Sequence, residues 1–236
     1  MGRGIVWVLA LGLVVPWNAD AASTLVLDAT ADSVLRYAHP DQNDGAAEQL
    51  LLKTGGGIVR SLVGFDIPSL GQGRVLVRAT LLLTITRMEK TWGSGRYVAV
   101  HRMREPWVEG NGRVDEVSWF RGLKPRPGSG EGVTWNCAID TRLGDPVADC
   151  ATGWAGGTFV SQLTDAVLHV NGMAGAMAWD MTEDVADLIA AGGEVSWIVK
   201  KENEKLKGGK VYYYSREGAA YLKKPALGPR LILEFD

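Results

Sequence analysis

The stretch ATLLLTI at residues 79–85 sets the fold class of this chain. Apolar side chains stand at every second position from Ala79 to Ile85, with two threonines and Leu82 between them. Because successive side chains of a β-strand point to opposite faces, this alternation predicts a strand with one buried face. The same period recurs in three further segments, at residues 98–100, 195–199 and 231–235.

Clusters of Gly, Pro, Asn and Asp lie between the alternating segments, at residues 43–45, 54–57, 125–132 and 208–209. Short strands separated by such turns are typical of sandwiches and jelly rolls, and not of the alternating strands and helices that build a parallel sheet. No linker divides residues 22–236, and their length suits one sandwich. We therefore predict a single all-β domain over residues 22–236, an antiparallel β-sandwich of the jelly-roll type with one short helix.

The predicted helix follows Asp180. Asp180 and Glu183 have the spacing of a capping box, residues 185–189 carry an apolar stripe, and two glycines at residues 192–193 end the helix. Residues 159–170 also allow a helical interpretation, but their β-branched side chains favour an extended chain.

The N-terminus has the pattern of a secretory signal peptide. Arg3 precedes an apolar run at residues 5–15, and small residues at positions 19 and 21 predict cleavage after residue 21. We expect residues 1–21 to be removed, which leaves a secreted protein without a stable membrane anchor, either extracellular, periplasmic or at the cell surface. An uncleaved N-terminal anchor is the alternative.

Charge and cysteine content narrow the class of protein further. The chain carries 25 basic and 27 acidic residues, a net charge of −2, which argues against a nucleic-acid partner because phosphate binding needs a basic face. Cys137 and Cys150 are the two cysteines. In an oxidising compartment they predict one disulfide, worth roughly 3 kcal/mol by closing a short loop.

Several segments together resemble the DNRLRE domain family, which is related to the disaggregatase repeats. They include ADSVLR at residues 31–36 and FDIPSL at residues 65–70. The full set, in chain order, is residues 31–36, 40–45, 50–53, 60–70, 79–83, 98–103, 107–110, 133–136, 154–157, 179–182, 214–215 and 229–231. One branch of this family is described as a carbohydrate-binding module for alginate, so the resemblance implies a β-sandwich that binds an extracellular, acidic polysaccharide.

The chain departs from the family pattern at three places. Gly64 stands where the family usually has a basic residue, Asp44 stands where it often has an aromatic one, and residues 111–132 form an insertion. Loops and binding faces are where such families diversify, so the ligand transfers less well than the fold.

Arginine, lysine and tryptophan side chains are the candidate ligand-binding groups. Arginine forks onto carboxylates, lysine supplies a point charge, and aromatic rings stack on the apolar faces of sugars. Arg36, Lys53 and Arg60 match basic positions of the family and are expected to line one sheet face, with ordinary surface charge as the alternative. The candidate set is Arg36, Lys53, Arg60, Trp92, Arg102 and Trp119.

Trp92 and Trp119 are flanked by Gly, Ser or charged residues and are interpreted as exposed platforms. The other loop tryptophans, Trp107, Trp135 and Trp154, are interpreted as packing residues. Residues 201–205, KENEK, are interpreted as a solvated hairpin tip.

No cofactor is predicted; the sequence favours no bound metal, with a structural calcium ion as the alternative. Carboxylates are the ligands that calcium prefers, and the candidates are Asp28, Asp32, Asp41 and Asp44.

No nucleophile elbow, zinc motif or phosphate loop occurs in the sequence. Glu109 and Asp66 are the sharpest carboxylate candidates for a lyase or glycosidase, and both are interpreted as framework residues. We expect a polysaccharide-binding protein, with a structural or adhesive cell-surface protein, or less favoured a polysaccharide lyase, as the alternatives.

Overall fold

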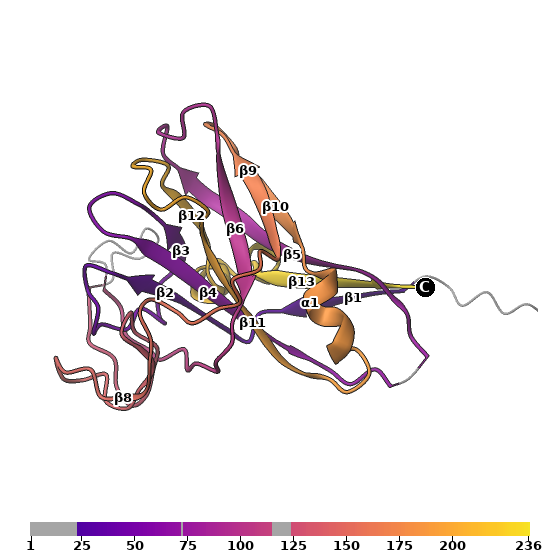
Figure 1. Cartoon of the computed structure of the whole chain (residues 1–236), viewed down its shortest axis with the longest axis horizontal. Helices are drawn as coiled ribbons and strands as arrows, with labels where there is room; N and C mark the ends of the chain where they lie inside the picture. The colour runs from indigo at the N-terminus through magenta and orange to yellow at the C-terminus, as the bar shows by residue number, and fades with distance from the viewer. Residues whose placement is uncertain (1–22, 72, 115–123) are drawn as a thin grey trace, which may run out of the picture.

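The computed structural model describes residues 23–71, 73–114 and 124–236, and it is built mostly of antiparallel β-strands (Figure 1). Two large sheets enclose the main core, so the predicted all-β sandwich is confirmed. The predicted signal peptide and Trp119 lie outside the described residues.

The first sheet is organised around the long strand β5 (Leu76–Met88), which contains the ATLLLTI stretch. One edge of β5 pairs with β13 along its first half and with β12 along its last residues, while its other edge pairs with β10. Strand β1 extends the sheet beyond β13, and β3 extends it beyond β12. The bounds are β1 (Ser23–Asp28), β3 (Gln49–Leu52), β10 (Gly175–Asp180), β12 (Val211–Tyr214) and β13 (Arg230–Phe235).

The second sheet has the order β2-β4-β11-β6-β9. Its strands are β2 (Ala31–Arg36), β4 (Val59–Ile67), β11 (Gly193–Lys201), β6 (Arg96–Arg102) and β9 (Asp165–His169). Strand β9 confirms part of the extended chain predicted for residues 159–170.

Alternate side chains of the two sheets meet in the main core. Trp179 of β10 is fully buried there, and its indole Nε1 donates a hydrogen bond of 3.0 Å to the carbonyl of Val98 in β6. Because this bond joins one sheet to the other, it fixes their spacing as well as satisfying a buried donor.

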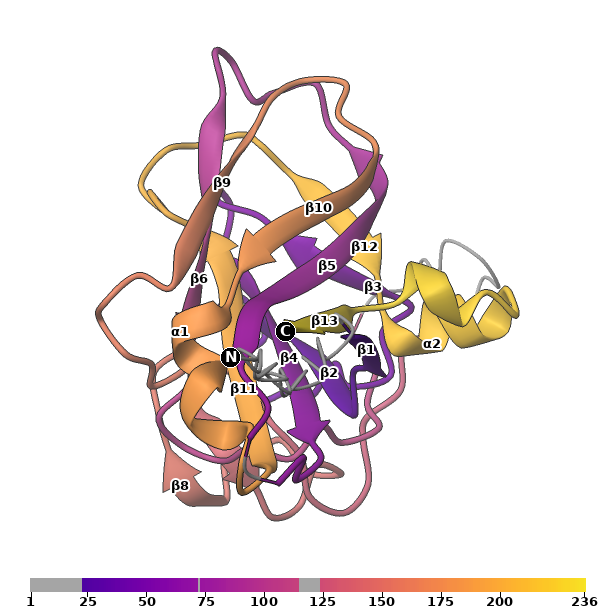
Figure 2. The ribbon, with the colours of Figure 1, turned by 90° about the vertical axis from the view of Figure 1, so that its right-hand side faces the viewer.

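A third layer covers the outer face of the second sheet. The chain leaves β6, and Met103 pairs in a β-bridge with Phe159 where it returns. Between them lies the hairpin of β7 (Cys137–Asp140) and β8 (Cys150–Gly153), closed by the predicted disulfide, which is confirmed. The hairpin lies at the opposite end of the molecule from the β5–β6 and β9–β10 turns (Figures 1 and 2).

A second apolar cluster holds this layer in place. It joins side chains of the second sheet to two tryptophans of the covering segment. Its buried members are Leu35, Leu62, Met103, Val133, Trp135, Ala138, Trp154 and Ile198. Met103, Val133, Trp135, Ala138 and Trp154 of the covering segment therefore occupy part of the outer face of the second sheet.

The predicted helix is present as α1 (Thr182–Val185), continued by the 3₁₀ turn η1 (Ala186–Leu188). The capping-box prediction is wrong by one position, because the N-cap residue is Met181. The carboxylate of Asp180 still accepts hydrogen bonds from the backbone N–H and the hydroxyl of Thr182, at 2.9 and 2.6 Å.

A second short helix, α2 (Arg216–Tyr221), was not predicted, and the 3₁₀ turn η2 (Pro225–Leu227) follows it. Figure 2 shows α2 on the other side of the molecule from α1. The hydroxyl of Ser215 caps it by accepting the backbone N–H of Gly218 at 3.1 Å. No helix among the described residues is long and apolar enough to cross a membrane.

Candidate binding cleft at Trp107

The structure does not bring the predicted basic residues together on one sheet face. Leu35 of β2 pairs with Arg60 of β4, and Arg36 pairs with Val59, so Arg36 and Arg60 point to opposite faces. Arg36 faces inward, where its Nε lies 2.6 Å from Oδ2 of the buried Asp44. The expectation of a shared basic face is therefore wrong for this pair.

Arg60 lies under the third layer instead of at a free surface. Its guanidinium makes a two-pronged ion pair with Glu204, with both bonds at 2.8 Å, and stacks 4.9 Å from the ring of Trp135. It also donates to the carbonyl of Gly156. Arg60 thus ties the covering segment to the second sheet. Lys53 is half-buried beside the β3–β4 turn.

Trp92 is fully buried, so the prediction of an exposed platform is wrong for it. Its ring lies 5.4 Å from that of His169 and 5.5 Å from the ammonium of Lys201. The interpretation of residues 201–205 as a solvated tip is wrong at its first residue, because Lys201 is 1% exposed.

Arg102, another of the predicted ligand-binding residues, does lie in a cleft. The cleft has a volume of about 510 Å³ and opens on the second sheet beside the segment that leaves β6. Its lining residues are Thr30, Ala31, Gly64, Phe65, Arg102, Met103, Arg104, Glu105, Pro106, Trp107, Glu194, Val195 and Ser196. We call it the Trp107 cleft.

Small residues form the floor of the Trp107 cleft. Ala31 pairs with Gly64 across β2 and β4, and Gly64 pairs with Ser196 across β4 and β11. The indole of Trp107 lies over this row, because a Cβ atom on Gly64 would be 3.5 Å from its Cζ2. The absence of a side chain at Gly64 therefore leaves the space that Trp107 borders.

Trp107 is both a packing residue and a partly exposed ring. It packs against the second apolar cluster, as its interpretation from sequence implied, and it remains half-buried. A half-buried indole that lines a cleft and is supported by packing suits stacking on the apolar face of a sugar.

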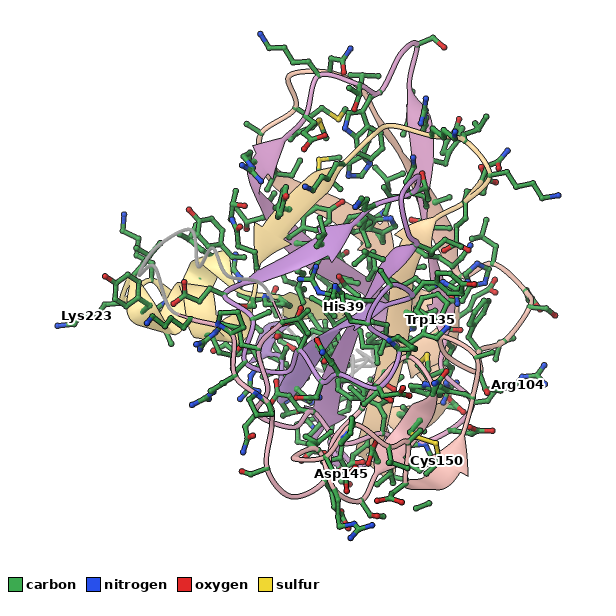
Figure 3. All side chains as sticks on the ribbon, turned by 90° about the vertical axis from the view of Figure 1, so that its left-hand side faces the viewer. His39, Arg104, Trp135, Asp145, Cys150 and Lys223 are labelled. Atoms are coloured by element: carbon green, nitrogen blue, oxygen red, sulfur yellow. A yellow bond between two sulfur atoms is a disulfide. The ribbon has the colours of Figure 1, made fainter. Side chains whose placement is uncertain are left out.

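Charged groups surround the ring. Arg102 lies 3.7 Å from Asp187, a distant and exposed ion pair. Arg104 is exposed, and its side chain extends out from the molecule in Figure 3. Among the described residues, Oε2 of Glu105 is buried without a hydrogen-bond donor. The lining of the cleft thus carries two guanidinium groups, of Arg102 and Arg104, and two carboxyl groups, of Glu105 and Glu194.

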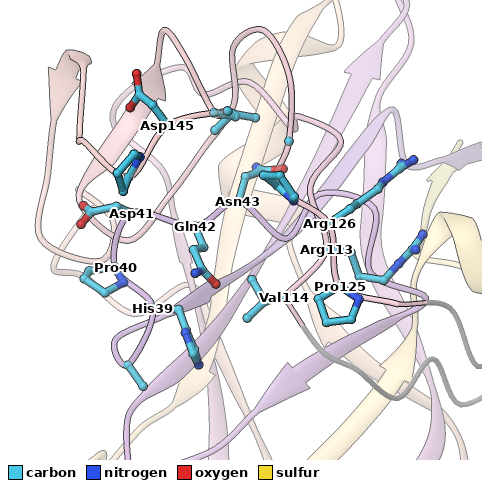
Figure 4. Close-up of a pocket in the computed structure, with 16 residues that line it drawn as sticks. His39, Pro40, Asp41, Gln42, Asn43, Arg113, Val114, Pro125, Arg126 and Asp145 are labelled. Carbon is cyan, nitrogen blue, oxygen red and sulfur yellow. The ribbon is translucent and has the colours of Figure 1, made fainter.

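A second cleft, of about 570 Å³, lies between residues 38–43 and the loops at 125–128 and 143–146 (Figure 4). Arg113 and Arg126 pair backbone to backbone there, and their side chains extend side by side. No Trp, Tyr or Phe is among its described lining residues. Because its described lining has no such aromatic ring, the second cleft differs from the Trp107 cleft in the groups it offers.

Carboxyl groups gather next to the Trp107 cleft, around the start of α2. Asp32, Glu109 and Glu217 each place an oxygen within 4.8 Å of the others. Nη1 of Arg216 contacts both oxygens of Glu109, at 2.8 and 2.9 Å. The backbone N–H of Arg216 donates to Asp32 at 2.7 Å, and that of Asp32 donates to Glu109 at 2.7 Å.

Burial raises the pKa of the Asp32 carboxyl well above its usual value, and the neighbouring Glu217 carboxyl adds to this rise. Burial also raises the pKa of Glu217, with Glu109 as the next cause. Because three carboxyl groups lie beside one guanidinium, ionising all of them together is unfavourable.

The other carboxylate candidates lie apart from this cluster. Asp28 and Asp66 are exposed, Asp41 accepts a hydrogen bond from Asn136 at 2.6 Å, and Asp44 pairs with Arg36. Calcium binding stays a prediction, and of its four candidates Asp32 alone belongs to the carboxyl cluster within the described chain.

We predict that Asp32→Asn flattens the dependence of stability on pH. Above the ordinary carboxyl pKa, the unfolded chain releases a proton that folded Asp32 retains, so the free energy of unfolding of the native sequence falls as pH rises towards the folded pKa. Asparagine keeps an oxygen for the N–H of Arg216 but does not titrate. Urea unfolding from pH 4 to 8, with and without calcium, measures the difference, and Asp66→Asn is the exposed control. An unchanged slope in Asp32→Asn would contradict the prediction.

No protein-family model matches the chain, and no curated protein matches it. The resemblance to the DNRLRE family stays a prediction. The case for function therefore rests on the cleft itself.

Proposed function

We propose that this protein is an exported, DNRLRE-like β-sandwich that binds an extracellular polysaccharide through the Trp107 cleft. One observation carries the proposal: a half-buried indole lies over the side-chain-free position Gly64, in a cleft that also holds two arginines. The disulfide between Cys137 and Cys150 supports export, since disulfides persist in oxidising compartments.

The lining of the Trp107 cleft offers apolar and charged groups to a sugar. The ring of Trp107 offers an apolar face for a pyranose, and the guanidinium groups of Arg102 and Arg104 offer paired donors for a carboxylate. The exposed carboxylate of Glu194, in the same lining, offers an acceptor for sugar hydroxyls. The two arginines attract a uronate-containing chain, whereas Glu105 and Glu194 repel it, so binding to an acidic chain and to a neutral glucan has to be compared directly.

The site also favours binding over catalysis. The two catalytic candidates do not act as a pair of carboxylates. Glu109 is held by Arg216, and Asp66 is exposed on β4. We therefore propose a non-catalytic module. A structural or adhesive role is the alternative, and it predicts no retention by any polysaccharide.

We predict that Trp107→Ala abolishes retention in affinity electrophoresis through gels containing alginate, pectate or neutral glucan. Removal of a central tryptophan costs about 2 kcal/mol or more, which corresponds to about thirtyfold in the dissociation constant. Tyr97→Ala is the matched control, because Tyr97 is 47% exposed on β6 and does not line the cleft.

Two substitutions of Gly64 test whether the ligand occupies the space above the floor of the Trp107 cleft. Gly64→Ala fits, because its Cβ would meet only ordinary contacts at 3.5 Å and beyond, whereas Gly64→Met fills the cleft. Retention that survives both Trp107→Ala and Gly64→Met, in variants with unchanged thermal unfolding, would remove the Trp107 cleft as the site.

A further inference from the structure

The segment that carries Trp107 has three anchors, and one of them is a charged contact. Residues 107–110 form no strand, yet they are anchored on three sides. The N–H of Val133 donates to the carbonyl of Val108 at 2.6 Å, and the amide of Asn43 donates to the carbonyl of Glu109 at 2.7 Å. The side chain of Glu109 supplies the third anchor, through Arg216 and the backbone of Asp32.

The contact of Glu109 links three parts of the fold. Glu109 belongs to the cleft segment, Asp32 to β2 and Arg216 to the first turn of α2. Both oxygens of Glu109 are used, and the Glu109 and Arg216 side chains are 23% and 35% exposed. Because one nitrogen of Arg216 contacts both oxygens and the N–H of Asp32 donates to one of them, the carboxylate of Glu109 is held by two elements at once.

We propose that Glu109 is a positioning residue for the Trp107 cleft, which acts with Arg216 to hold the indole over Gly64. Glu109 lies two residues beyond Trp107, so a rotation of its backbone moves the indole relative to the floor formed by β2, β4 and β11. Glu109 has no catalytic part in this proposal, although it is the sharpest catalytic candidate from the sequence. The expected effect of Glu109 on polysaccharide affinity rests on the proposed function, whereas its expected effect on the position of the indole does not.

The position of the ring is measured directly by ¹⁹F NMR of the full chain labelled with 5-fluorotryptophan. The signal of Trp107 is assigned as the one missing from Trp107→Phe. In Glu109→Gln, which keeps an acceptor for the N–H of Asp32 but loses the charge, we expect the Trp107 signal to shift or broaden while the other signals stay. Glu131→Gln is the control, because Glu131 is an exposed carboxylate in the third layer.

Affinity gives a second readout that a purely structural role would not move. We expect the alginate dissociation constant to rise about tenfold in Glu109→Gln and in Arg216→Ala. The double variant is expected to lose no more than either single one, because the two side chains act as one unit. Thermal unfolding of each variant identifies any that fail to fold, and Glu109→Gln is the milder change.

The outcomes separate the two proposals. An unmoved Trp107 signal in folded Glu109→Gln overturns the positioning role, whatever happens to affinity. Additive losses in the double variant overturn the shared action with Arg216. If the signal moves but Trp107→Ala binds polysaccharide as the native sequence does, the positioning role stands and the cleft is not the binding site.

Discussion

Gly45→Ala is expected to destabilise the folded protein by about 3 kcal/mol or more. A Cβ atom at this position would lie 2.1 Å from the carbonyl oxygen of Glu109 and 2.7 Å from that of Gly110. Both are backbone atoms, so no side chain can rotate away to make room. The backbone of the cleft segment must shift, and the anchors on Asn43 and Glu109 then weaken together.

Urea unfolding measures this loss, and Gly144→Ala is the matched control. Gly144 has an ordinary backbone conformation, and the nearest atom to its added Cβ would be the carbonyl oxygen of Gly128 at 3.7 Å. Since alanine restricts the unfolded chain, the control is expected to be unchanged or more stable by up to about 1 kcal/mol. Equal stability of Gly45→Ala and the native sequence would show that the segment yields without cost.

The clash also explains why Gly45 belongs to a turn cluster in the sequence. The Asn43-Asp44-Gly45 stretch predicts a turn, and the structure adds a second demand, close approach of residues 109–110. Residues 109–110, which approach Gly45, lie more than sixty residues further along the chain. Local pattern indicates where a glycine is needed but not which distant backbone requires it.

The strands were predictable because burial follows a period of two. The stretch at residues 79–85 forms the centre of β5, and Leu231 and Leu233 of β13 are buried as their alternation predicts. The disulfide followed from the presence of two cysteines. These features depend on local spacing or on elimination, and need no knowledge of which strands pair.

The binding residues were less predictable, because they depend on pairing register and on coverage. Arg36 and Arg60 fall on opposite faces by a register that the sequence does not display. Trp92 has turn-like neighbours, yet the Gly208–Gly209 loop closes over it, and a Cβ on Gly209 would lie 3.2 Å from its ring. Exposure is set by the partner segment, not by flanking residues.

The sequence carried one signal for the cleft and one for helix α2, which supplies Arg216 and Glu217. The departure at Gly64 from the resembled family marks the floor of the Trp107 cleft. Ser215, followed by acidic Glu217 near the start of α2, is a capping signal, but no apolar stripe follows it, so the helix was missed. The carboxyl cluster assembles from residues 32, 109 and 217, which only the fold brings together.

Lys201 is expected to make the protein more stable as pH rises from about 8 to 10. The ammonium is buried beside Trp92 and donates hydrogen bonds to the hydroxyl of Thr54 and the carbonyls of Leu206 and Gly208. Burial, with the charge of Arg96 as the next cause, lowers the pKa of Lys201 from 10.5 to about 8. The folded protein therefore releases a proton at a pH where the unfolded chain still holds it.

The sign follows from proton counting. Between the two pKa values the unfolded state binds more protons, so the free energy of unfolding rises with pH. One pKa unit corresponds to about 1.4 kcal/mol, which sets an upper limit of about 3 kcal/mol on the effect of Lys201, reached only above the pKa of the unfolded chain. Burial also raises the pKa of Tyr213, which acts in the opposite direction above the ordinary range of a phenol, so the measurement belongs between pH 7 and 9.5.

Lys201→Met isolates this effect, because methionine keeps a long apolar chain and does not titrate. Stability at a single pH is not diagnostic, since methionine leaves the carbonyls of Leu206 and Gly208 without the ammonium donor. The slope is diagnostic: the native sequence and the exposed control Lys205→Met are expected to gain stability from pH 7 to 9.5, and Lys201→Met is expected to gain less. Burial also lowers the pKa of Lys200, but this contribution is common to all three chains and cancels in the comparison. Equal slopes of the free energy of unfolding against pH in Lys201→Met and Lys205→Met would contradict the prediction. They would mean that Lys201 keeps its charge in the folded protein at no cost, because three oxygen acceptors and the face of Trp92 replace water completely.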